Sequence, residues 1–313
     1  MNVLVTGGAG FIGRAVVKRL LEDRHKVYVL DNLSNGSKDN LIEFEDCTGF
    51  KGLIVGDIRD EGQLNRIFKR NIDICVHMAA QVNVQASIDH PEENYDINVN
   101  GTFRIMESAR KTNTKVVLVS TCMVYAPAIT SSPITEGHRT MPASPYAGSK
   151  LAAENLAGSY YYAYGLPVVI LRPFNIYGPF QKTNMEGGVV SIFVSRKIRG
   201  EKLPIFGQGN QTRDLMFVDD CADFIVKASY SPEAGGEIFN AGSGKDISVN
   251  DLAMAIVKEK NMIKHVPHPH PQSEINKMVC DNRKSRYILG WKPRISLTKG
   301  IERLEKWLRE ATV

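Results

Sequence analysis

Short apolar runs rich in β-branched residues alternate with helical stretches along about the first 170 residues of the chain. The runs are apolar throughout, as in strands that helices cover on both faces, and do not alternate apolar with polar positions. They occupy residues 3–6, 27–30, 53–55, 74–77, 116–120 and 168–171. This succession of strands and helices predicts an α/β fold with a doubly wound parallel sheet of the Rossmann type.

The pattern changes after Arg172, where the chain becomes a series of loops marked by glycine and proline. Such loops are typical of a lobe that surrounds a ligand. We expect a Rossmann domain over residues 1–172 and a smaller C-terminal substrate-binding lobe mainly over 173–313, with a return to the first domain around 214–242. Within the smaller lobe, Ser248 is followed three residues later by an aspartate, a spacing that predicts the start of a helix.

The composition is that of an ordinary globular protein, with 43% hydrophobic and 23% charged residues. The net charge of +5 comes from 39 basic and 34 acidic residues spread along the chain, which does not indicate a nucleic-acid-binding stripe. The first residues lack the pattern of a signal peptide, and no apolar stretch approaches the roughly 20 residues that span a bilayer, so we expect a cytoplasmic protein. Five widely spaced cysteines without a C-x-x-C pair predict reduced thiols and no structural zinc.

A glycine-rich turn directly follows the first predicted strand and opens a helix. Gly7 permits a tight turn, Gly10 lets the backbone approach a pyrophosphate, and Gly13 allows close packing of the helix on the strand. Asp31 ends the next strand 18 residues after Gly13, where a carboxylate holds the ribose hydroxyls of a dinucleotide. Because this carboxylate would repel a 2′-phosphate and no arginine follows in residues 32–36, the sequence favours NAD over NADP.

A tyrosine and a lysine lie four residues apart just after Pro145, which suits the first position of a helix. Tyr146 and Lys150 would therefore share one helix face. The lysine charge, helped by an oxidised nicotinamide, lowers the pKa of the tyrosine, so that its phenolate can take a hydroxyl proton while hydride leaves the same carbon. Alone, such a pair more often lies on a helix surface, but beside the glycine turn it predicts alcohol oxidation.

Together these motifs resemble the extended short-chain dehydrogenase/reductase superfamily, and within it the NAD-dependent epimerase/dehydratase family of nucleotide-sugar enzymes. The resemblance covers essentially the whole chain. Its other matching segments are residues 56–58, 77–81, 98–102, 120–125 and 172–179. It implies an enzyme that uses NAD and acts on a UDP-hexose through a 4-keto intermediate.

The resemblance also implies roles for individual residues. Thr121 would hydrogen-bond the reacting sugar oxygen and complete a triad with Tyr146 and Lys150. The residues that would bind the cofactor are Gly7, Gly10, Phe11, Ile12, Gly13, Asp31, Asn32, Ser34, Asn35, Gly36, Asp57, Ile58, Met78, Ala79, Ala80, Gln81, Asn98, Ser120, Tyr146, Lys150 and Pro173. The residues that would bind the nucleotide sugar are Thr121, Met123, Asn175, Gly188, Val189, Phe206, Arg213 and Glu274.

Arg213 is the strongest single candidate among the substrate residues, because a guanidinium fork suits a diphosphate. Its other interpretation is a surface ion pair near Asp214, worth under about 1 kcal/mol. The family often has an arginine near His270, and this sequence departs from that pattern.

Two further features indicate packing rather than chemistry. His265, His268 and His270 alternate with prolines, which predicts an extended loop and no metal site. The tyrosines within residues 160–164 favour packing of a long helix over stacking on bases. In the family, that helix and the one around residues 98–110 form a four-helix bundle between two subunits, so we expect a homodimer.

The two residues after Thr121 bear on the reaction. Family members that remove water across carbons 5 and 6 carry Asp and Glu there, whereas this chain has Cys122 and Met123. Methionine cannot usefully accept a proton, so an ordinary 4,6-dehydratase is disfavoured. Carbon-4 epimerisation of UDP-glucose or UDP-GlcNAc needs only the triad and NAD, and stays open.

A third route is similar to that of bacterial enzymes of pseudaminic acid synthesis, which act on UDP-GlcNAc-5,6-ene. The similar segments are residues 120–125 and 178–182. In this route Cys122 would donate a proton to carbon 5 and give a 4-keto-6-deoxy sugar, although Cys122 can equally be a buried apolar thiol. A non-catalytic, NAD-sensing Rossmann protein is the alternative of another class, but it would leave the triad without a purpose.

Overall fold

The computed structural model describes residues 1–128, 132–183, 188–267 and 276–311. Its main element is a seven-stranded sheet in the order β10-β6-β5-β4-β1-β2-β3, in which each strand runs parallel to its neighbours. The strands are β1 (Asn2–Thr6), β2 (Lys26–Asp31), β3 (Phe50–Val55), β4 (Ile74–His77), β5 (Lys115–Val119), β6 (Val168–Pro173) and β10 (Ile238–Ala241). This sheet confirms the predicted fold class.

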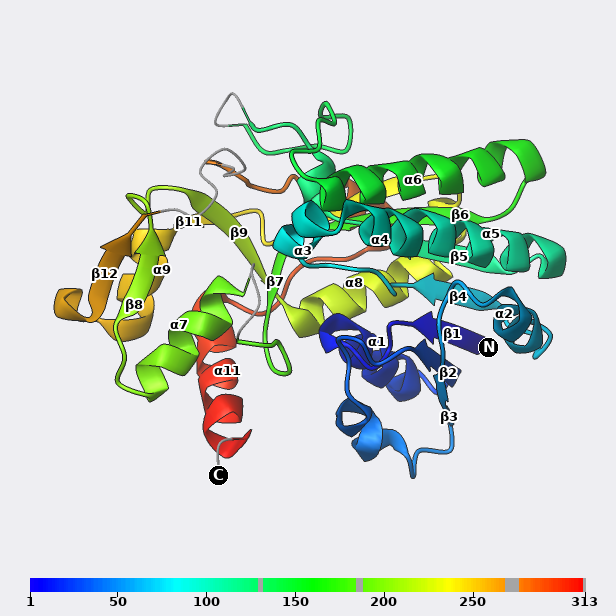
Figure 1. Ribbon diagram of the computed structural model, residues 1–313, viewed down its shortest axis with the longest axis horizontal. Coiled ribbons are helices and arrows are strands. Elements are labelled where there is room, and N and C mark those ends of the chain that lie inside the picture. Colours follow the sequence, from blue (N-terminus) through cyan, green and yellow to red (C-terminus); the bar gives the residue numbers. More distant parts are fainter. Residues whose placement is uncertain (129–131, 184–187, 268–275, 312–313) are drawn as a thin grey trace.

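Helices cover both faces of the sheet, with α5 and α6 on one face and α1 and α8 on the other (Figure 1). The covering helices are α1 (Phe11–Glu22), α2 (Glu61–Phe68), α5 (Gly101–Thr112), α6 (Pro145–Tyr164) and α8 (Val218–Tyr230). Successive side chains of β1 point to opposite faces. Val3 and Val5 join the apolar cluster of α1 and α8, and Leu4 joins that of α2, α5 and α6. Burial on both faces therefore explains the uninterrupted apolar runs.

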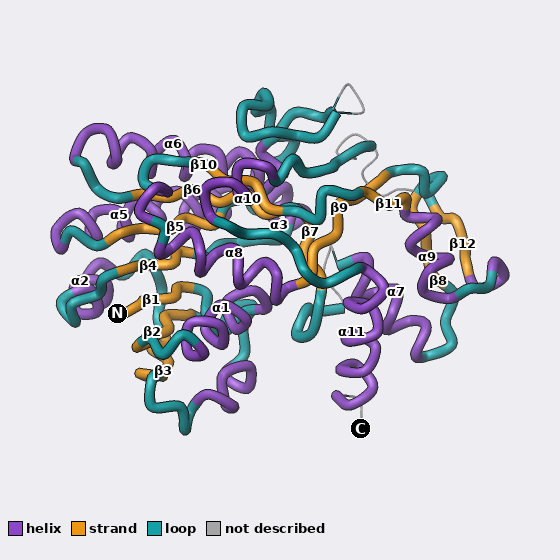
Figure 2. The backbone as a smooth tube through the Cα atoms, turned by 180° about the vertical axis from the view of Figure 1, so that it is seen from behind, coloured by secondary structure: helices purple, strands orange, loops and turns teal. Residues whose placement is uncertain are grey.

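A smaller lobe follows the carboxyl end of β6, and only Phe174 separates β6 from β7, the first strand of this lobe. Figures 1 and 2 show this lobe beside the large sheet. Its sheets have the orders β11-β9-β7 and β12-β8. Its elements are β7 (Asn175–Tyr177), α7 (Val189–Ile198), β8 (Leu203–Phe206), β9 (Thr212–Phe217), β11 (Asp246–Ser248), α9 (Val249–Val257), β12 (Ile263–Val266) and α11 (Leu297–Ala311).

The predicted capping box begins α9. Ser248 Oγ accepts the N–H of Asp251 at 3.0 Å and donates to its carboxylate at 2.6 Å. The remaining short elements are η1 (Lys38–Phe44), α3 (Val84–Asp89), α4 (Pro91–Tyr95), η2 (Asp96–Asn100), η3 (Cys122–Val124), η4 (Pro232–Ala234), η5 (Lys260–Met262) and α10 (Arg283–Leu289). All those labelled η are 3₁₀ helices except η2, which is a π-helical turn.

Candidate active site

The turn between β1 and α1 brings glycine backbones into close contact. Gly7 has a φ of +73°, and its N–H donates to the Leu30 carbonyl at 2.8 Å. A Cβ on Gly13 would clash with the Gly7 carbonyl and lie 2.7 Å from the Cα of Gly8. Gly10 caps α1, and no side chain in the described part of the protein caps this helix start. The first N–H groups of α1 therefore suit a phosphate, and the turn fits a dinucleotide. The first two residues of α1 are half-buried: Phe11 and Ile12.

Asp31, at the end of β2, joins this turn to the loop that follows. One carboxylate oxygen accepts the N–H of Ala9 at 3.0 Å, and the other accepts that of Leu33 at 2.8 Å. A carboxylate has about four acceptor positions, so Asp31 retains capacity for ribose hydroxyls. Gly36 lies against Ala9, where a Cβ would be 2.8 Å from the Ala9 carbonyl. Three other predicted residues of the loop are exposed: Asn32, Ser34 and Asn35.

Asp57 lies beside this loop, with one oxygen 3.4 Å from the Asn32 side-chain amide. The sequence did not lead us to expect a role for Arg59, which donates to both Asp57 oxygens at 2.9 and 2.7 Å and also pairs with Asp96. Hydrogen bonding by Arg59 holds the pKa of Asp57 below its usual value. Ile58 is buried against the start of α5. Arg59 thus fixes the Asp57 carboxylate, which we expected to bind the cofactor.

The chain after β4 is held between the glycine turn and η2. Thr6 Oγ1 accepts the N–H groups of Met78 and Ala79 at 3.1 and 3.2 Å. The N–H of Gln81 donates to Asn98 Oδ1 at 2.8 Å, and Asn98 Nδ2 donates back to the Gln81 carbonyl at 3.1 Å. The residues of this segment that we expected to line the cofactor site are half-buried: Met78, Ala79, Ala80 and Gln81.

Tyr146 and Lys150 lie in the first turns of α6, which begins at Pro145 with Ser144 as its N-cap. Both side chains are buried, at 9% and 4% exposure, and Lys150 Nζ donates to the Val119 carbonyl at 2.8 Å. Thr121 lies close enough to the Tyr146 side chain to lower the pKa of the tyrosine through hydrogen bonding. The structure therefore brings the three predicted triad residues together at the end of β5.

Burial sets the protonation of these groups. It raises the pKa of Tyr146 to about 12, against a lowering by the Thr121 hydrogen bond. Burial also lowers the pKa of Lys150 to about 8, while the charge of Glu154 opposes that shift. In this structure Tyr146 is thus a phenol, and Lys150 is a cation at neutral pH.

A buried ion pair behind the triad had no signal in the sequence. Arg172 Nε donates to the two carboxylate oxygens of Glu154 at 3.0 and 3.1 Å, and both side chains are at most 4% exposed. The Arg172 guanidinium also stacks 4.7 Å from the ring centroid of Tyr125, whose hydroxyl donates to Asn240 at 2.7 Å. The neighbouring Ser120 Oγ is buried and has no hydrogen-bond partner within the described ranges. That orphaned hydroxyl is consistent with a site that a cofactor completes.

Cys122 begins η3, directly after Thr121, and is 3% exposed. Its thiol donates to Met278 Sδ at 3.2 Å, within an apolar cluster that includes Phe174 and Cys280. Burial raises the pKa of Cys122 to about 12, and the charge of Asp214 acts in the same direction. Cys122 is therefore a protonated thiol at neutral pH, next to the triad. Another expected substrate residue packs against the same cluster: Met123.

The expected substrate residues of the smaller lobe come from several elements. Asn175 Nδ2 donates to the Asp214 carbonyl at 3.3 Å and lies 3.9 Å from Met278 Sδ, which connects it to Cys122. Arg213 lies on β9, and its guanidinium donates to the Thr212 carbonyl at 2.8 Å. The other described members are Gly188, the N-cap of α7; Val189, its first residue; and Phe206, the last residue of β8, at 45% exposure. Glu274, His268 and His270 lie outside the described residues.

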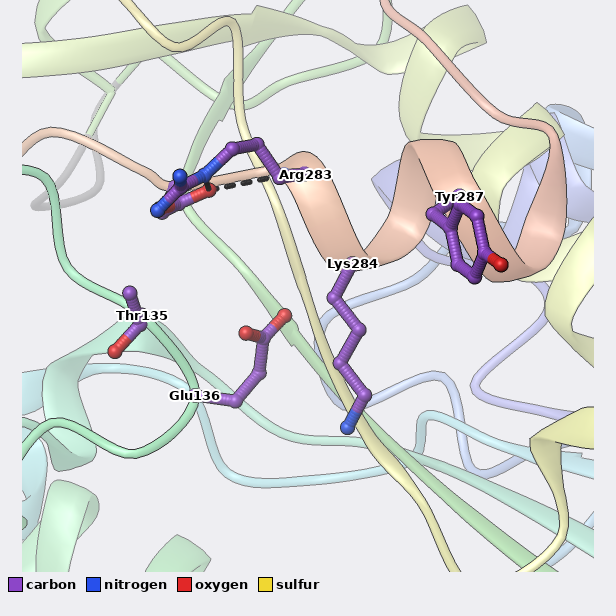
Figure 3. Close-up of a pocket in the computed structure, with 6 residues that line it drawn as sticks. Thr135, Glu136, Arg283, Lys284 and Tyr287 are labelled. Atoms are coloured by element: carbon purple, nitrogen blue, oxygen red, sulfur yellow. Dashed lines mark hydrogen bonds and ion pairs between the residues drawn. The ribbon is translucent and has the colours of Figure 1, made fainter.

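An open pocket of about 370 Å³ lies elsewhere, beside β10 and α10. Figure 3 shows Thr135 and Glu136 on one side of it and Arg283, Lys284 and Tyr287, from α10, on the other. No residue of the triad lines it. Across the described ranges, no three His, Cys, Asp or Glu side chains form a group that could hold a metal ion. None of the helices described is long and apolar enough to cross a membrane.

Comparison with known proteins places this geometry in a family. The sequence pattern of the NAD dependent epimerase/dehydratase family matches residues 3–242. A putative UDP-glucose 4-epimerase of Methanocaldococcus jannaschii is 37% identical over 312 residues, which cover 98% of each protein.

Solved structures agree with the sequence match. Pal from Bacillus thuringiensis has 52% sequence identity and a TM-score of 0.97, over 99% of this chain and 100% of that one. The UDP-glucose 4-epimerase of Thermotoga maritima, solved with UDP-glucose, has 33% identity and a TM-score of 0.93, over 100% of both chains. The family, the enzymatic nature and the cofactor inferred from the motifs are confirmed, which removes the non-catalytic alternative. The chain belongs to the NAD-dependent epimerase/dehydratase family of enzymes.

Proposed function

We propose that this enzyme acts on a UDP-N-acetylhexosamine through a 4-keto intermediate and converts UDP-GlcNAc-5,6-ene to a 4-keto-6-deoxy sugar. The observation that carries the proposal is the buried, protonated thiol of Cys122, which directly follows Thr121 where family dehydratases have carboxylates. The UDP part of the substrate is supported by the relative from Thermotoga maritima, which was solved with UDP-glucose.

The cofactor would be held by the glycine turn, the start of α1 and Asp31. When bound there, NAD would supply the hydride chemistry of the reaction, as an acceptor for carbon 4 of the sugar and a donor for carbon 6. The chain after β4 would also line the cofactor site, and hydrogen bonds between the Gln81 main chain and the Asn98 side chain hold that segment in place.

Tyr146 would take the proton of the carbon-4 hydroxyl, and Thr121 would hydrogen-bond the same oxygen. Their mutual hydrogen bond indicates that both side chains can reach one atom. The positive charge of Lys150, one helical turn from Tyr146, favours the phenolate that this step needs. Together these groups account for oxidation at carbon 4.

Addition of hydride to carbon 6 of the enone would leave an enolate, and Cys122 would then protonate carbon 5 of that enolate. A pKa raised to about 12 keeps the proton on sulfur until a strongly basic carbon is presented. The hydrogen on carbon 4 moves to carbon 6, the hydroxyl proton leaves through Tyr146, and the thiol proton enters at carbon 5. The thiolate recovers a proton from solvent or from Tyr146, so substrate and product are isomers and NAD is regenerated.

The nucleotide part of the substrate would lie against the smaller lobe. Arg213 and Asn175 suit the diphosphate, because a guanidinium and an amide both donate to phosphate oxygens. Gly188 and Val189, at the start of α7, would contact it through backbone N–H groups. The proposed set also includes Met123, Phe206 and Glu274.

A simple carbon-4 epimerase is the second candidate. The relatives from Methanocaldococcus jannaschii and Thermotoga maritima carry that name, and epimerisation needs no acid at carbon 5. In this case Cys122 contributes only to packing.

The experiment follows product formation by NMR in deuterated water. The wild type should convert UDP-GlcNAc-5,6-ene to the 4-keto-6-deoxy sugar with solvent deuterium at carbon 5. Cys122→Ala should still oxidise carbon 4 but form the product about a hundredfold more slowly. The matched control is Cys221→Ala, which removes another buried thiol, in α8. An enzyme that ignores the ene, interconverts UDP-GlcNAc and UDP-GalNAc and tolerates Cys122→Ala is instead the epimerase.

We also propose that two copies associate through α5 and α6, which pack side by side in each copy. Aromatic side chains on these helices remain exposed in the single chain, with Phe103 at 37% and Tyr162 at 83%. A second copy would cover such surface. Light scattering of the purified enzyme tests for a dimer.

A further inference from the structure

A buried histidine connects the glycine turn to η2. His77 ends β4 and is 1% exposed. Its Nδ1 lies 2.8 Å from Thr6 Oγ1, and its Nε2 lies 3.0 Å from Thr102 Oγ1. The two threonine side chains are also buried, at 0% and 1% exposure. Nothing proposed for the reaction so far uses this imidazole.

The directions of these hydrogen bonds follow from counting protons on the two threonines. Thr6 Oγ1 already accepts two backbone N–H groups, those of Met78 and Ala79, so its own proton must go to His77 Nδ1. Thr102 Oγ1 donates to the Asn98 carbonyl at 2.6 Å, so it must accept a proton from Nε2. Both counts give the same result: Nδ1 is bare and Nε2 carries the proton.

The charge of the ring agrees with this count. Burial, with the charge of Lys150 acting in the same direction, lowers the pKa of His77 to about 3. A second proton on Nδ1 would also face the hydroxyl proton of Thr6. The imidazole is therefore neutral at physiological pH.

The chain of hydrogen bonds continues from Asn98 to α6. Asn98 Nδ2 donates to Ser149 Oγ at 2.9 Å, and Ser149 Oγ donates to the Tyr146 carbonyl at 2.8 Å. Because the Gln81 N–H can only donate, Asn98 Oδ1 must accept it, and this fixes the orientation of the amide. A chain of directed hydrogen bonds, linked through the main chain and side chain of Asn98, thus runs from the base of the glycine turn to the backbone of Tyr146.

We propose that His77, fixed as the neutral Nε2–H tautomer, is a positioning residue that sets the turn of α6 carrying Tyr146 relative to the cofactor-binding turn. The proposal rests on the proposed role of Tyr146 as the base. The hydrogen bond at each ring nitrogen can form in one direction only, as an acceptor at Nδ1 and a donor at Nε2. His77 therefore links the end of β1 to the start of α5 in one fixed ring orientation. The other tautomer, with the proton on Nδ1, would leave two protons facing each other at Thr6 and two lone pairs facing each other at Thr102.

The first test reads the tautomer directly, by NMR of the NAD-loaded enzyme labelled with ¹⁵N-histidine. The signal of His77 is assigned by its absence in His77→Asn. We expect a neutral ring with the proton on Nε2 throughout pH 6 to 8. A proton on Nδ1, or a ring that becomes charged in this range, would overturn the proposal.

The second test breaks the chain without changing the histidine. Thr102→Val removes one hydroxyl at nearly constant volume, and Thr114→Val is the matched control. Thr114 is also 1% exposed, and its hydroxyl also donates to a main-chain carbonyl, that of Ile72, at 2.9 Å. We expect Thr102→Val to lower kcat about tenfold with little change in KM, as for a misplaced catalytic group. Thr102→Ser, which keeps the hydroxyl, should restore kcat.

Equal kcat values for Thr102→Val and Thr114→Val, with equal losses in melting temperature, would reduce the chain to a purely structural role and overturn the proposal. If Thr102→Val does not fold, the tautomer of His77 and the kcat of Thr102→Ser still test the proposal. A Thr102→Ser variant with the tenfold loss of kcat expected for Thr102→Val would contradict the proposal, because the serine keeps the hydroxyl. Tyr146→Phe separates the two hypotheses. If that variant keeps full turnover, the proposed base is wrong, whereas the tautomer of His77 is measured independently.

Discussion

The two sides of the candidate active site hold their side chains in different ways. On the α6 side, Tyr146, Lys150 and Asn98 are positioned by hydrogen bonds to backbone and to Ser149. On the opposite side, which we call the sulfur side, Cys122 packs among Met278, Cys280, Phe174 and other apolar groups. Its thiol donates a weak hydrogen bond to Met278 Sδ. Hydrogen bonds position the side chains on the α6 side, and apolar packing positions Cys122 on the sulfur side.

The proposed base and the proposed acid also differ in their neighbours. Burial raises the pKa of Tyr146 and that of Cys122 to the same value, about 12. At Tyr146 hydrogen bonding by Thr121 opposes the effect of burial. At Cys122 the Asp214 carboxylate adds to the effect of burial and Arg213 opposes it. In the proposed mechanism the charge of Lys150, one helical turn from Tyr146, would favour loss of the tyrosine proton. The two proposed roles therefore depend on neighbouring groups and not on a difference in burial.

The largest effect is expected on the α6 side. Tyr146→Phe should lower turnover at least about a hundredfold, because it removes the positioned base while leaving the ring in its packing. Folding and NAD binding should be unchanged, as judged by melting temperature and cofactor titration. Tyr177→Phe is the matched control, since Tyr177 is a buried tyrosine whose hydroxyl donates to the Leu297 carbonyl. Near-normal turnover of Tyr146→Phe would remove this residue from the mechanism.

A smaller effect is expected at Asp31, the carboxylate at the end of β2 that is proposed to hold the cofactor. Asp31→Ala should reduce the preference for NAD over NADP about tenfold, the equivalent of about 1.4 kcal/mol. It should also lower the melting temperature, because the N–H groups of Ala9 and Leu33 lose their acceptor. Calorimetric titration with both cofactors measures the preference, and Asp39→Ala, at an exposed position nearby, serves as control. Predominantly NADP in the wild-type protein as purified would contradict the prediction.

The packing around the Cys122 thiol should tolerate change better than the hydrogen bonds of the α6 side. Met278→Leu preserves volume but removes the acceptor of the Cys122 thiol, a contact worth about 0.5 to 1 kcal/mol. The rate of deuterium transfer to carbon 5 should therefore change by only about threefold. The matched control is Met106→Leu, at a buried position of α5, which should leave this rate unaltered. A hundredfold loss in Met278→Leu would mean that hydrogen bonding, and not packing, positions the thiol.

The smallest effect concerns pH. Because the pKa of Cys122 is raised to about 12, the thiol loses its proton only as the pH rises toward that value. Lys150, whose pKa is lowered to about 8, loses its charge as the pH rises through that value, so the rate of carbon-4 oxidation should fall there. The ratio of the single-turnover rate of deuterium transfer to carbon 5 to the rate of carbon-4 oxidation isolates the thiol and should be flat between pH 6 and 9. A ratio that falls with a midpoint near 8.5, the value for an exposed thiol, would show that Cys122 is not held in the buried state described here.

Local motifs allowed the sheet, the cofactor and the grouping of Tyr146 with Lys150 to be predicted. Apolar runs indicate strands, and a spacing of four residues indicates one helix face, because both signals are contained within a few residues. The partners of Cys122 could not be predicted in this way. Met278 is 156 residues away in sequence and Asp214 carries no motif, so only the folded chain brings them to the thiol.

Other parts of the site escaped prediction for related reasons. The π-helical turn carries Asn98, whose side chain forms hydrogen bonds with Gln81 and Ser149, and nothing in the residue types of the turn indicates it. The pair of Glu154 and Arg172 joins a helix to a strand, and each residue alone looks like an ordinary surface charge.

Asp214 has a consequence for how relatives of this enzyme are compared. Its buried carboxylate accepts N–H groups from Ser243, Gly244 and Cys280, three residues that all follow residue 242, where the family pattern ends. Met278, the contact of Cys122, also follows it. Two proteins could therefore agree at every position of the family pattern and still differ in the acidity and orientation of the thiol. Sorting such enzymes by reaction requires the residues around 278–280 to be read together with Cys122.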